Sequence, residues 1–328
     1  MTAAFLAWAV HDVDLRDVLE GVRRANVLLI VASALLATLT FPLRTLRWRV
    51  LLRDVDGGRY PLAPLWDAVA IGFMANNLLP ARAGELARGW VASRRLPVRF
   101  TTALASIGVE RVFDGLTMLG LMAVAIAAPS FPSHATVRGT SLAHVAAGAA
   151  VVFGTLLLLA LVVVHRPAPW LSLFDRGARA LLPPRVAERV VSIVDGLVAG
   201  LEVLKSPSRF VAVVGWSLLL WLVNAAAFAL CFRAFGMHVP AEGALLLQGL
   251  IGFGVAIPSA PGFWGIFEGA TRLTLQFYGI GATSALAYAF AFHIAGFIPI
   301  TLLGLEALSR AHLHLGDLRG AAASAPVT

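Results

Sequence analysis

A run of mixed polarity, NNLLPARAGELARGW at residues 76–90, interrupts a largely apolar sequence. It carries two arginines, Arg82 and Arg88, with Glu85 between them. A guanidinium group can donate two parallel hydrogen bonds to a phosphate, so arginines that face a cavity in a membrane suit an anionic lipid headgroup. The alternative is an ion pair between Glu85 and Arg88, which share a helix face, close to the headgroups at an elbow of the chain.

A second charged group, Glu110, Arg111 and Asp114, also lies in apolar surroundings, with its two acids on one helix face. If the helix begins at Phe100, Glu110 lies about 15 Å along it. If the helix begins near Ile107, the group lies at the membrane interface instead. Both depths fit the sequence, and at the greater depth one of the acids could pair with an arginine of the first run.

A third group follows the motif PGFWGIFEG. Glu268 and Arg272 are four residues apart, which is a favourable spacing for a local ion pair on a helix. The alternative is that Glu268 is a membrane-embedded acid that pairs with the first run or carries a proton. His293 stands alone in the last apolar span, and we expect a hydrogen-bonded packing residue there in preference to a proton relay.

Basic and aromatic residues gather at the end of the first apolar span. Because such residues anchor helix ends at the interface, we expect Arg44, Arg47 and Trp48 to be anchors, with lipid phosphate contact as the alternative. The single cysteine, Cys231, excludes an internal disulfide, and its apolar surroundings indicate a small packing residue.

The composition identifies an integral membrane protein. The chain has 328 residues, 59% of them hydrophobic and 13% charged, and its mean hydropathy is +0.83. Soluble domains carry about 25% charged residues. The net charge of +8 comes almost entirely from arginine, and in a membrane protein such an excess sets the orientation of the spans. We expect no nucleic-acid partner.

The distribution of arginines predicts a re-entrant hairpin. Basic residues follow both apolar stretches, 26–43 and 62–79, so a full crossing by the second would place them on opposite sides of the membrane. A hairpin that enters and returns on one side removes this conflict, and Pro80 and Gly84 suit its elbow. Two asparagines before the elbow either line the cavity or satisfy the broken backbone: Asn76 and Asn77.

A second hairpin is predicted where 243–257 and 262–277 flank a proline- and glycine-rich elbow. The last span, 284–308, ends in basic residues that should be cytoplasmic, so this hairpin must enter from outside. Its elbow residues are Pro258, Pro261, Gly262 and Gly265. Paired interrupted segments of this kind mark the transport sites of many transporters.

The predicted fold is therefore an all-α polytopic membrane protein with about five full transmembrane helices and two opposed re-entrant hairpins. An amphipathic cytoplasmic helix is expected within 165–209, where apolar residues recur at helical spacing. The full crossings are expected at 26–43, 100–128, 141–164, 209–232 and 284–308. The chain divides into an N-terminal interfacial segment or truncated first helix, a single transmembrane domain, and a short basic, disordered cytoplasmic tail: 1–25, 26–308 and 309–328.

The two hairpin motifs resemble those of the lysylphosphatidylglycerol synthase transmembrane (flippase-like) family, also called UPF0104 or YbhN-like. The ER-x-x-D run at Glu110 and the RW pair at Arg47 also fit, whereas Phe263 stands where the family often has a second glycine. The first motif, N-x-x-P-x-R-x-G-E-x-x-R, is matched by Asn77, Pro80, Arg82, Gly84, Glu85 and Arg88. The second, P-x-x-P-G-G-x-G-x-x-E, is matched by Pro258, Pro261, Gly262, Gly265 and Glu268.

The resemblance implies lipid translocation. In a family member that also has a soluble aminoacyl-transfer domain, the membrane part moves the lipid product between leaflets. We expect this protein to have the membrane part alone, and an upstream first helix is usual in the family. We therefore expect a translocase of the cytoplasmic membrane for a phospholipid, an aminoacyl-phospholipid or a polyprenyl-linked sugar. Arg82 and Arg88 would hold the phosphate, and Glu85, Glu110 and Glu268 would balance the charge.

A non-transporting scaffold for a glycosyltransferase or lipid-modifying enzyme is the alternative function. The sequence has no HExxH, GxSxG or P-loop motif, so we expect no catalysis, cofactor or metal site.

Overall fold

The computed structural model is an all-α polytopic membrane protein. The structure describes residues 2–52, 57–79, 83–131, 165–200, 205–256 and 260–318, together with scattered positions between 136 and 162. The first half of the bundle contains α1 (Thr2–Val10), α2 (Leu15–Arg24), α3 (Val27–Thr38), α4 (Thr40–Leu51), α5 (Leu62–Leu78), α6 (Ala83–Arg95) and α7 (Phe100–Ala127). A short antiparallel ribbon follows, formed by β1 (Thr136–Val137) and β2 (Thr140–Ser141). The second half contains α9 (Pro167–Leu181), α10 (Pro184–Gly200), α11 (Pro207–Ala234), α12 (Ala241–Ala256), η2 (Pro261–Phe263), α13 (Ile266–Phe277) and α14 (Ala282–Arg310).

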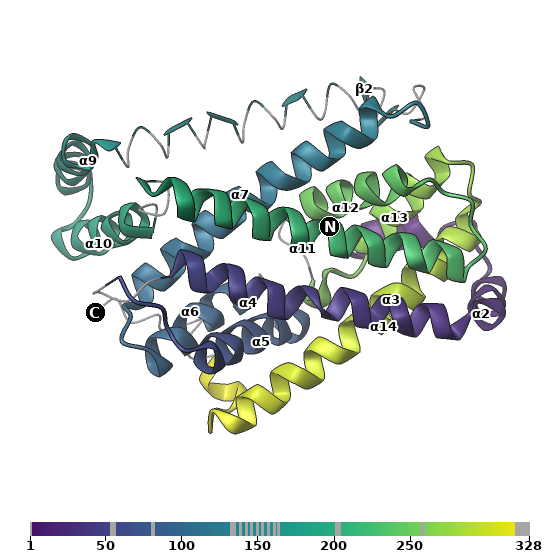
Figure 1. Cartoon of the computed structure of the whole chain (residues 1–328), viewed down its shortest axis with the longest axis horizontal. Helices are drawn as coiled ribbons and strands as arrows, with labels where there is room; N and C mark the ends of the chain where they lie inside the picture. The colour runs from purple at the N-terminus through teal and green to yellow at the C-terminus, as the bar shows by residue number, and fades with distance from the viewer. Residues whose placement is uncertain are drawn as a thin grey trace.

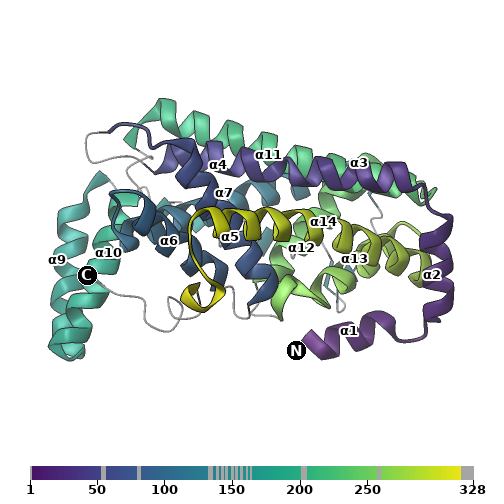
Figure 2. The ribbon, with the colours of Figure 1, turned by 90° about the horizontal axis from the view of Figure 1, so that it is seen from below.

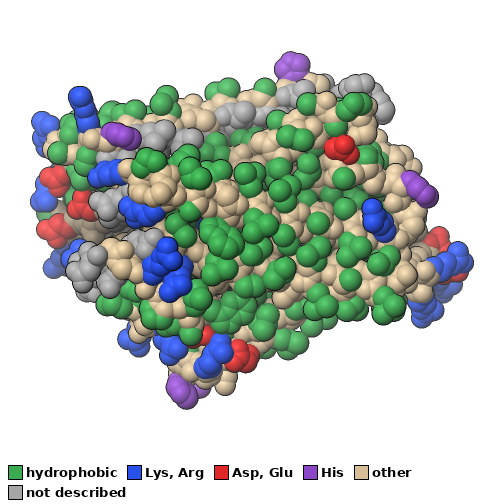
Figure 3. All heavy atoms as spheres, in the orientation of Figure 1, with side chains coloured by type: hydrophobic (Ala, Val, Ile, Leu, Met, Phe, Trp, Pro, Cys, Tyr) green, Lys and Arg blue, Asp and Glu red, His purple; other side chains and the backbone are tan. Residues whose placement is uncertain are grey.

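The long helices run along the length of an elongated bundle (Figures 1 and 2). Helices α3 and α4 follow one another beside α11, whereas α2 lies across one end of the bundle and α9 and α10 lie at the other (Figure 2). Hydrophobic side chains cover the middle of the visible face, and charged side chains gather at its two ends (Figure 3). This distribution is the one expected for a protein whose middle faces lipid.

Among the described residues, three helical stretches are long and apolar enough to cross a membrane: Val27–Leu51, Pro207–Ala234 and Ala282–Arg310. Helix α7 is also 28 residues long, but charged side chains interrupt its middle. The predicted end of the first span at Leu43 is wrong, because helix continues through α4 to Leu51. Two of the arginines at the predicted end of that span, Arg44 and Arg47, turn inward to acids on α7. The crossing predicted for 141–164 falls largely outside the described residues.

Helices α5 and α6 pack against each other as an antiparallel hairpin. Asp67, near the start of α5, binds Arg95 at the end of α6, with 2.9 Å between the carboxylate and the guanidinium. At the turn, Asn76 Oδ1 accepts a hydrogen bond from the Gly84 amide at 3.0 Å, so this asparagine satisfies the broken backbone. A Cβ on Gly84 would lie 1.9 Å from the Gly72 carbonyl oxygen, so the crossing requires glycine. Residues 80–82, and with them Pro80 and Arg82, lie outside the described residues.

Helices α12 and α13 form the second hairpin, with η2 in its elbow. Gly262 and Gly265 have φ of 67° and 83°, which glycine adopts without steric cost. Phe263 has φ of 61° in place of a second glycine, a conformation that costs a residue with a Cβ about 1–2 kcal/mol. Pro261 opens η2, whereas Pro258 lies outside the described residues.

The elbows of the two hairpins converge on the middle of α14. Asn77 Nδ2 donates to Thr301 Oγ1 at 2.9 Å and to the Phe297 carbonyl at 3.4 Å. A Cβ on Gly262 would lie 3.0 Å from the Phe297 ring, and η2 also packs on α5. Pro299 interrupts the hydrogen bonding of α14 at this level. A segment with a proline-weakened backbone therefore joins the two hairpins.

The surface segments agree with the sequence in part. Helix α2 is amphipathic, with Val18 buried, and Cys231 is a buried packing residue as predicted. The amphipathic helix expected within 165–209 is present as α10, and a further helix, α9, precedes it because the chain breaks at Pro183 and Pro184. The predicted tail is described up to Leu318, which is buried in the hydrophobic core that α4, α5, α6 and α7 share. Residues 319–328 lie outside the described residues.

Candidate functional site

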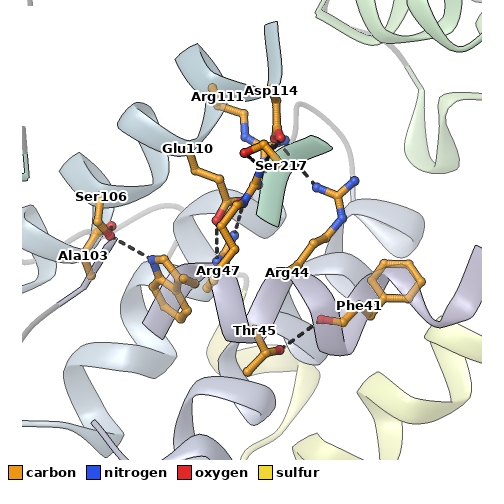
Figure 4. Close-up of polar contacts among 12 residues, drawn as sticks. Phe41, Arg44, Thr45, Arg47, Ala103, Ser106, Glu110, Arg111, Asp114 and Ser217 are labelled. Carbon is orange, nitrogen blue, oxygen red and sulfur yellow. Dashed lines mark hydrogen bonds and ion pairs between the residues drawn. The ribbon is translucent and has the colours of Figure 1, made fainter. Parts of the chain in front are cut away.

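A buried cluster of charges joins four helices of the bundle. Helix α4 extends two arginines toward α7, which contributes two acids and an arginine, and α6 adds a further arginine (Figure 4). Helix α11 contributes Ser217 and Trp221 to the same cluster. We call this the arginine cluster: Arg44, Arg47, Arg88, Glu110, Arg111 and Asp114.

Glu110 lies at the centre of the arginine cluster and has no exposed surface. Both terminal nitrogens of Arg88 donate to its two oxygens at 2.9 Å, which is the bidentate geometry of a strong ion pair. Arg47 Nη2 lies 3.2 Å from Glu110 Oε1, and Arg111 binds the same oxygen. Helix α7 begins at Phe100, so Glu110 lies about 15 Å along it.

Asp114, one turn further along α7, binds the remaining arginines. Arg47 binds its Oδ1 atom, Arg111 lies 3.1 Å and Arg44 3.7 Å from its Oδ2 atom, and the Trp221 indole donates to Oδ1 at 2.8 Å. Arg47 also donates to Ser217 Oγ at 3.0 Å. The two acids of α7 therefore hold side chains from three other helices in place.

The prediction that Arg44, Arg47 and Trp48 are interface anchors is wrong. Their relative exposures are 7%, 0% and 0%, so all three face the interior. Trp48 donates to Ser106 Oγ at 2.9 Å and lies 3.9 Å below the Arg88 guanidinium, which stacks on its ring. The reason is that the acids of α7 offer these arginines a stronger partner than the interface does.

The arginine cluster contains more positive than negative charge, with four guanidinium groups and two carboxylates; Glu85, at its edge, acts electrostatically on Arg111. Arg44 lies between the rings of Phe73 and Trp221, 5.1 Å and 4.9 Å from their centroids. Buried N–H groups without partners are costly, so an additional anion would complete the cluster. The buried guanidinium atoms that have no hydrogen-bond partner include Arg44 Nε and Nη1 and Arg47 Nε and Nη2.

The sequence model described as lysylphosphatidylglycerol synthase TM region matches residues 1–304. The chain belongs to this family. Two UPF0104 membrane proteins of Methanothermobacter thermautotrophicus are 26% and 22% identical to it over 306 residues, covering 89% of this chain and 86% and 88% of theirs.

A third relative is described as glycosyltransferase AglD of Haloferax volcanii. It is 27% identical over 300 residues, which cover 82% of this chain but 46% of that protein. The chain therefore spans less than half the length of this relative.

The structure places the described residues of the second motif outside the arginine cluster. The predicted ion pair of Glu268 with Arg272 is wrong, because each side chain caps a different part of the backbone. Glu268 binds the Gly265 amide at 2.6 Å and His293 at 2.6 Å. Arg272 donates to carbonyls at the end of α1, those of Trp8, Ala9 and His11.

Sequence reasoning missed a buried acid, Asp67, which has 1% relative exposure. It binds Arg95 at 2.9 Å and Arg310 at 2.7 Å, and so joins both ends of the first hairpin to the end of α14. The available signal was a single acid within the apolar run LAPLWDAVAIGF.

The arginine cluster is largely closed in this conformation. Two surface grooves of about 510 and 380 Å³ lie elsewhere, at the end of α14 and between α4 and α5. Arg111, with 31% side-chain exposure, is the most accessible member of the cluster. A ligand would therefore approach from the Arg111 side and would reach Arg44 only if the helices separate.

Proposed function

We propose that this protein is a lipid translocase in which the arginine cluster binds the phosphate of a phospholipid, aminoacyl-phospholipid or polyprenyl-linked sugar. The observation that carries the proposal is the excess of buried guanidinium groups over carboxylates, together with the Nε groups of Arg44 and Arg47, which have no hydrogen-bond partner among the described residues. Buried ionisable residues in a membrane domain are candidates for a substrate path. A phosphate offers the negative charge that would balance the four guanidinium groups against the two carboxylates.

The contacts divide the arginines into two roles. Arg88 uses both terminal nitrogens on Glu110, and Arg47 binds both acids, so these two hold the acids of α7 in place. Arg44 makes a 3.7 Å ion pair and two ring contacts, and Arg111, which also binds both acids, is the partly exposed arginine of the cluster. We therefore assign the phosphate to Arg44 and Arg111. Arg82, which lies outside the described residues, stays a predicted further contact with the headgroup.

In this account the α5–α6 and α12–α13 hairpins are re-entrant from opposite sides of the cell membrane, with the C-terminus cytoplasmic. Their elbows meet at Phe297 of α14, so a small movement of either would open a path beside the cluster. Discontinuous helices that meet near the midplane are the usual setting of a transport site. The basic end of the bundle, with α9 and α10, would face the cytoplasm.

A scaffold for a glycosyltransferase is the second candidate function, and one observation favours it. The similarity to the protein described as glycosyltransferase AglD covers 46% of that protein, so a similar segment occurs there beside a further part. A scaffold would bind an enzyme and would tolerate changes in the arginine cluster that leave the protein folded, such as Arg44→Gln. A translocase would not tolerate them.

We expect Arg44→Gln to slow lipid movement by at least about tenfold, equivalent to 1.4 kcal/mol. The reason is that a charge-assisted hydrogen bond to a phosphate is worth about 1.5–3 kcal/mol. The measurement uses the purified protein in liposomes with fluorescent phosphatidylglycerol in both leaflets. It follows how quickly the lipid of the inner leaflet moves outward and becomes accessible to an impermeant quencher outside.

The matched control is Arg49→Gln, on the same helix, since Arg49 donates to the Tyr60 carbonyl outside the cluster. Its rate should stay within about twofold of wild type, which is below 0.5 kcal/mol. Equal rates for wild type and a folded Arg44→Gln variant would contradict the assignment of the phosphate. Absence of movement with any headgroup would favour the scaffold.

A further inference from the structure

A buried pair of titratable side chains lies at the elbow of the second hairpin, outside the arginine cluster. Glu268 has no exposed surface, and the His293 side chain is 11% exposed. His293 Nδ1 lies 2.6 Å from Glu268 Oε1, and His293 Nε2 lies 2.8 Å from the Gly262 carbonyl oxygen. The other carboxylate oxygen accepts the Gly265 amide at 2.6 Å. One imidazole therefore links α14 to both ends of the elbow.

The number of hydrogen-bond donors at this link decides its protonation. A carbonyl and an ionised carboxylate only accept, and a neutral imidazole has a single N–H to donate. Neutral His293 beside ionised Glu268 could therefore make one of its two contacts but not both. Both contacts require a further proton, carried either on the imidazole or on Glu268, which then donates to Nδ1.

We propose that Glu268 and His293 form a proton-binding site, in which one shared proton holds the elbow of the second hairpin against α14. Release of the proton removes a donor, so either the contact with Gly262 or the contact with Glu268 breaks. The ligand of this site is a single proton.

No other charged group competes for this proton among the described residues. Arg272, one turn beyond Glu268, is held by carbonyls of α1, and the rings of Trp264 and Phe267 cover the imidazole at 4.2 and 4.6 Å. Helices α1 and α3 and the η2 turn contain no titratable side chain, and the charged side chains of α2 are exposed.

The remaining charges on neighbouring elements lie at helix ends or are already bound. On α5, Asp67 is bound by two arginines. On α14, the Tyr288 hydroxyl donates to the Phe228 carbonyl. The others are at the start of α12, at the two ends of α11 and at the end of α14: Glu242, Arg209, Arg233, Glu306 and Arg310.

The proton site lies on α14 next to the place where the elbows of the two hairpins meet. The Phe297 ring, one turn beyond His293 on α14, packs next to Gly262, and its carbonyl accepts from Asn77 of the first hairpin. Breaking the contact with Gly262 therefore frees the second elbow where the first one docks. If the protein translocates lipid as proposed above, proton binding should control that movement; the existence of the proton site itself does not depend on this function.

Proton occupancy can be measured on the wild-type protein in lipid bilayers. Solid-state NMR with ¹⁵N-labelled histidine gives the protonation of both His293 nitrogens, with the signal assigned by its loss in His293→Asn. Infrared spectroscopy gives the protonation of Glu268, assigned with Glu268→Gln. At neutral pH we expect either a doubly protonated His293 imidazole, or a protonated Glu268 carboxyl beside a neutral His293 imidazole. A neutral imidazole beside an ionised Glu268 in the folded wild-type protein would overturn the proposal.

Coupling to movement is tested in vesicles of phosphatidylethanolamine and phosphatidylglycerol with a fluorescent phosphatidylglycerol. We expect an imposed pH gradient to change the wild-type rate of lipid movement at least about threefold. The rate of His293→Gln should stay unchanged, because glutamine does not titrate and its amide can donate to ionised Glu268 without the shared proton. His238→Gln, at an exposed histidine, should respond as wild type does. A wild-type rate that is measurable but insensitive to the gradient would overturn the coupling, whereas absence of lipid movement would overturn the proposed function and leave the spectroscopic result standing.

Discussion

Replacing Glu110 with glutamine should leave little folded protein. Glutamine keeps the shape of the side chain, but it removes the charge that three arginines share, and its amide group places donors against guanidinium donors. Removal of one partner from a buried ion pair costs about 3–5 kcal/mol, since the other charge remains buried. The measurement is the free energy of unfolding in mixed micelles, or the yield of monodisperse protein when the variant is too unstable to titrate.

The matched control is Glu306→Gln, which breaks a 3.1 Å pair with Arg310 at a position where the Glu306 side chain is 54% exposed. Its cost should stay below about 1 kcal/mol, as for other exposed pairs. Adding Arg88→Met to Glu110→Gln should recover part of the loss, because it removes one of the uncompensated charges. Near-native stability of Glu110→Gln alone would contradict the view that this acid holds the cluster together.

The second large effect is expected at the first hairpin, where Gly84→Ala should destabilise the protein by about 3 kcal/mol or more. The new Cβ would lie 1.9 Å from the Gly72 carbonyl oxygen, which belongs to the backbone and cannot rotate away. Helices α5 and α6 would have to separate, which also moves Arg88 relative to Glu110. Thermal unfolding in detergent gives the change in stability.

Gly120→Ala provides the control for this variant. Gly120 also lies in a helix, but a Cβ there meets nothing within 4 Å. Alanine should therefore be neutral or stabilising by up to about 1 kcal/mol, because glycine has the lower helix propensity. If both variants behaved alike, close packing would not be the reason for glycine at position 84.

The parts of the fold that sequence could predict are those set by local chemistry. Gly262 and Gly265 have positive φ, which only glycine adopts at no cost, so the second elbow was visible in the motif. The first hairpin could be predicted because arginines follow both the span before it, 26–43, and its own first arm, 62–79. Its turn also confirmed one of two predicted roles for Asn76, which satisfies a backbone amide.

The arginine cluster could be predicted only in part, because its partners are distant in sequence. Arg47 and Asp114 are 67 residues apart, so nothing local distinguishes a buried arginine of α4 from an interfacial one. Glu110 and Arg88 are 22 residues apart, and their pairing was one of several that the sequence allowed. The link of Glu268 to His293 was missed in favour of Arg272, because helical spacing indicated the nearer partner.

The central claim, that the arginine cluster binds a lipid phosphate, is tested most directly by solid-state NMR between ³¹P and ¹⁵N-labelled arginine. The protein is prepared in a phosphorus-free detergent with one equivalent of phosphatidylglycerol, so that the bound lipid supplies the phosphorus. We predict a phosphorus–guanidinium dipolar contact in the wild-type protein that is lost in Arg44→Gln and kept in Arg49→Gln. A contact of equal strength in wild type and Arg44→Gln would place the phosphate elsewhere and contradict the account.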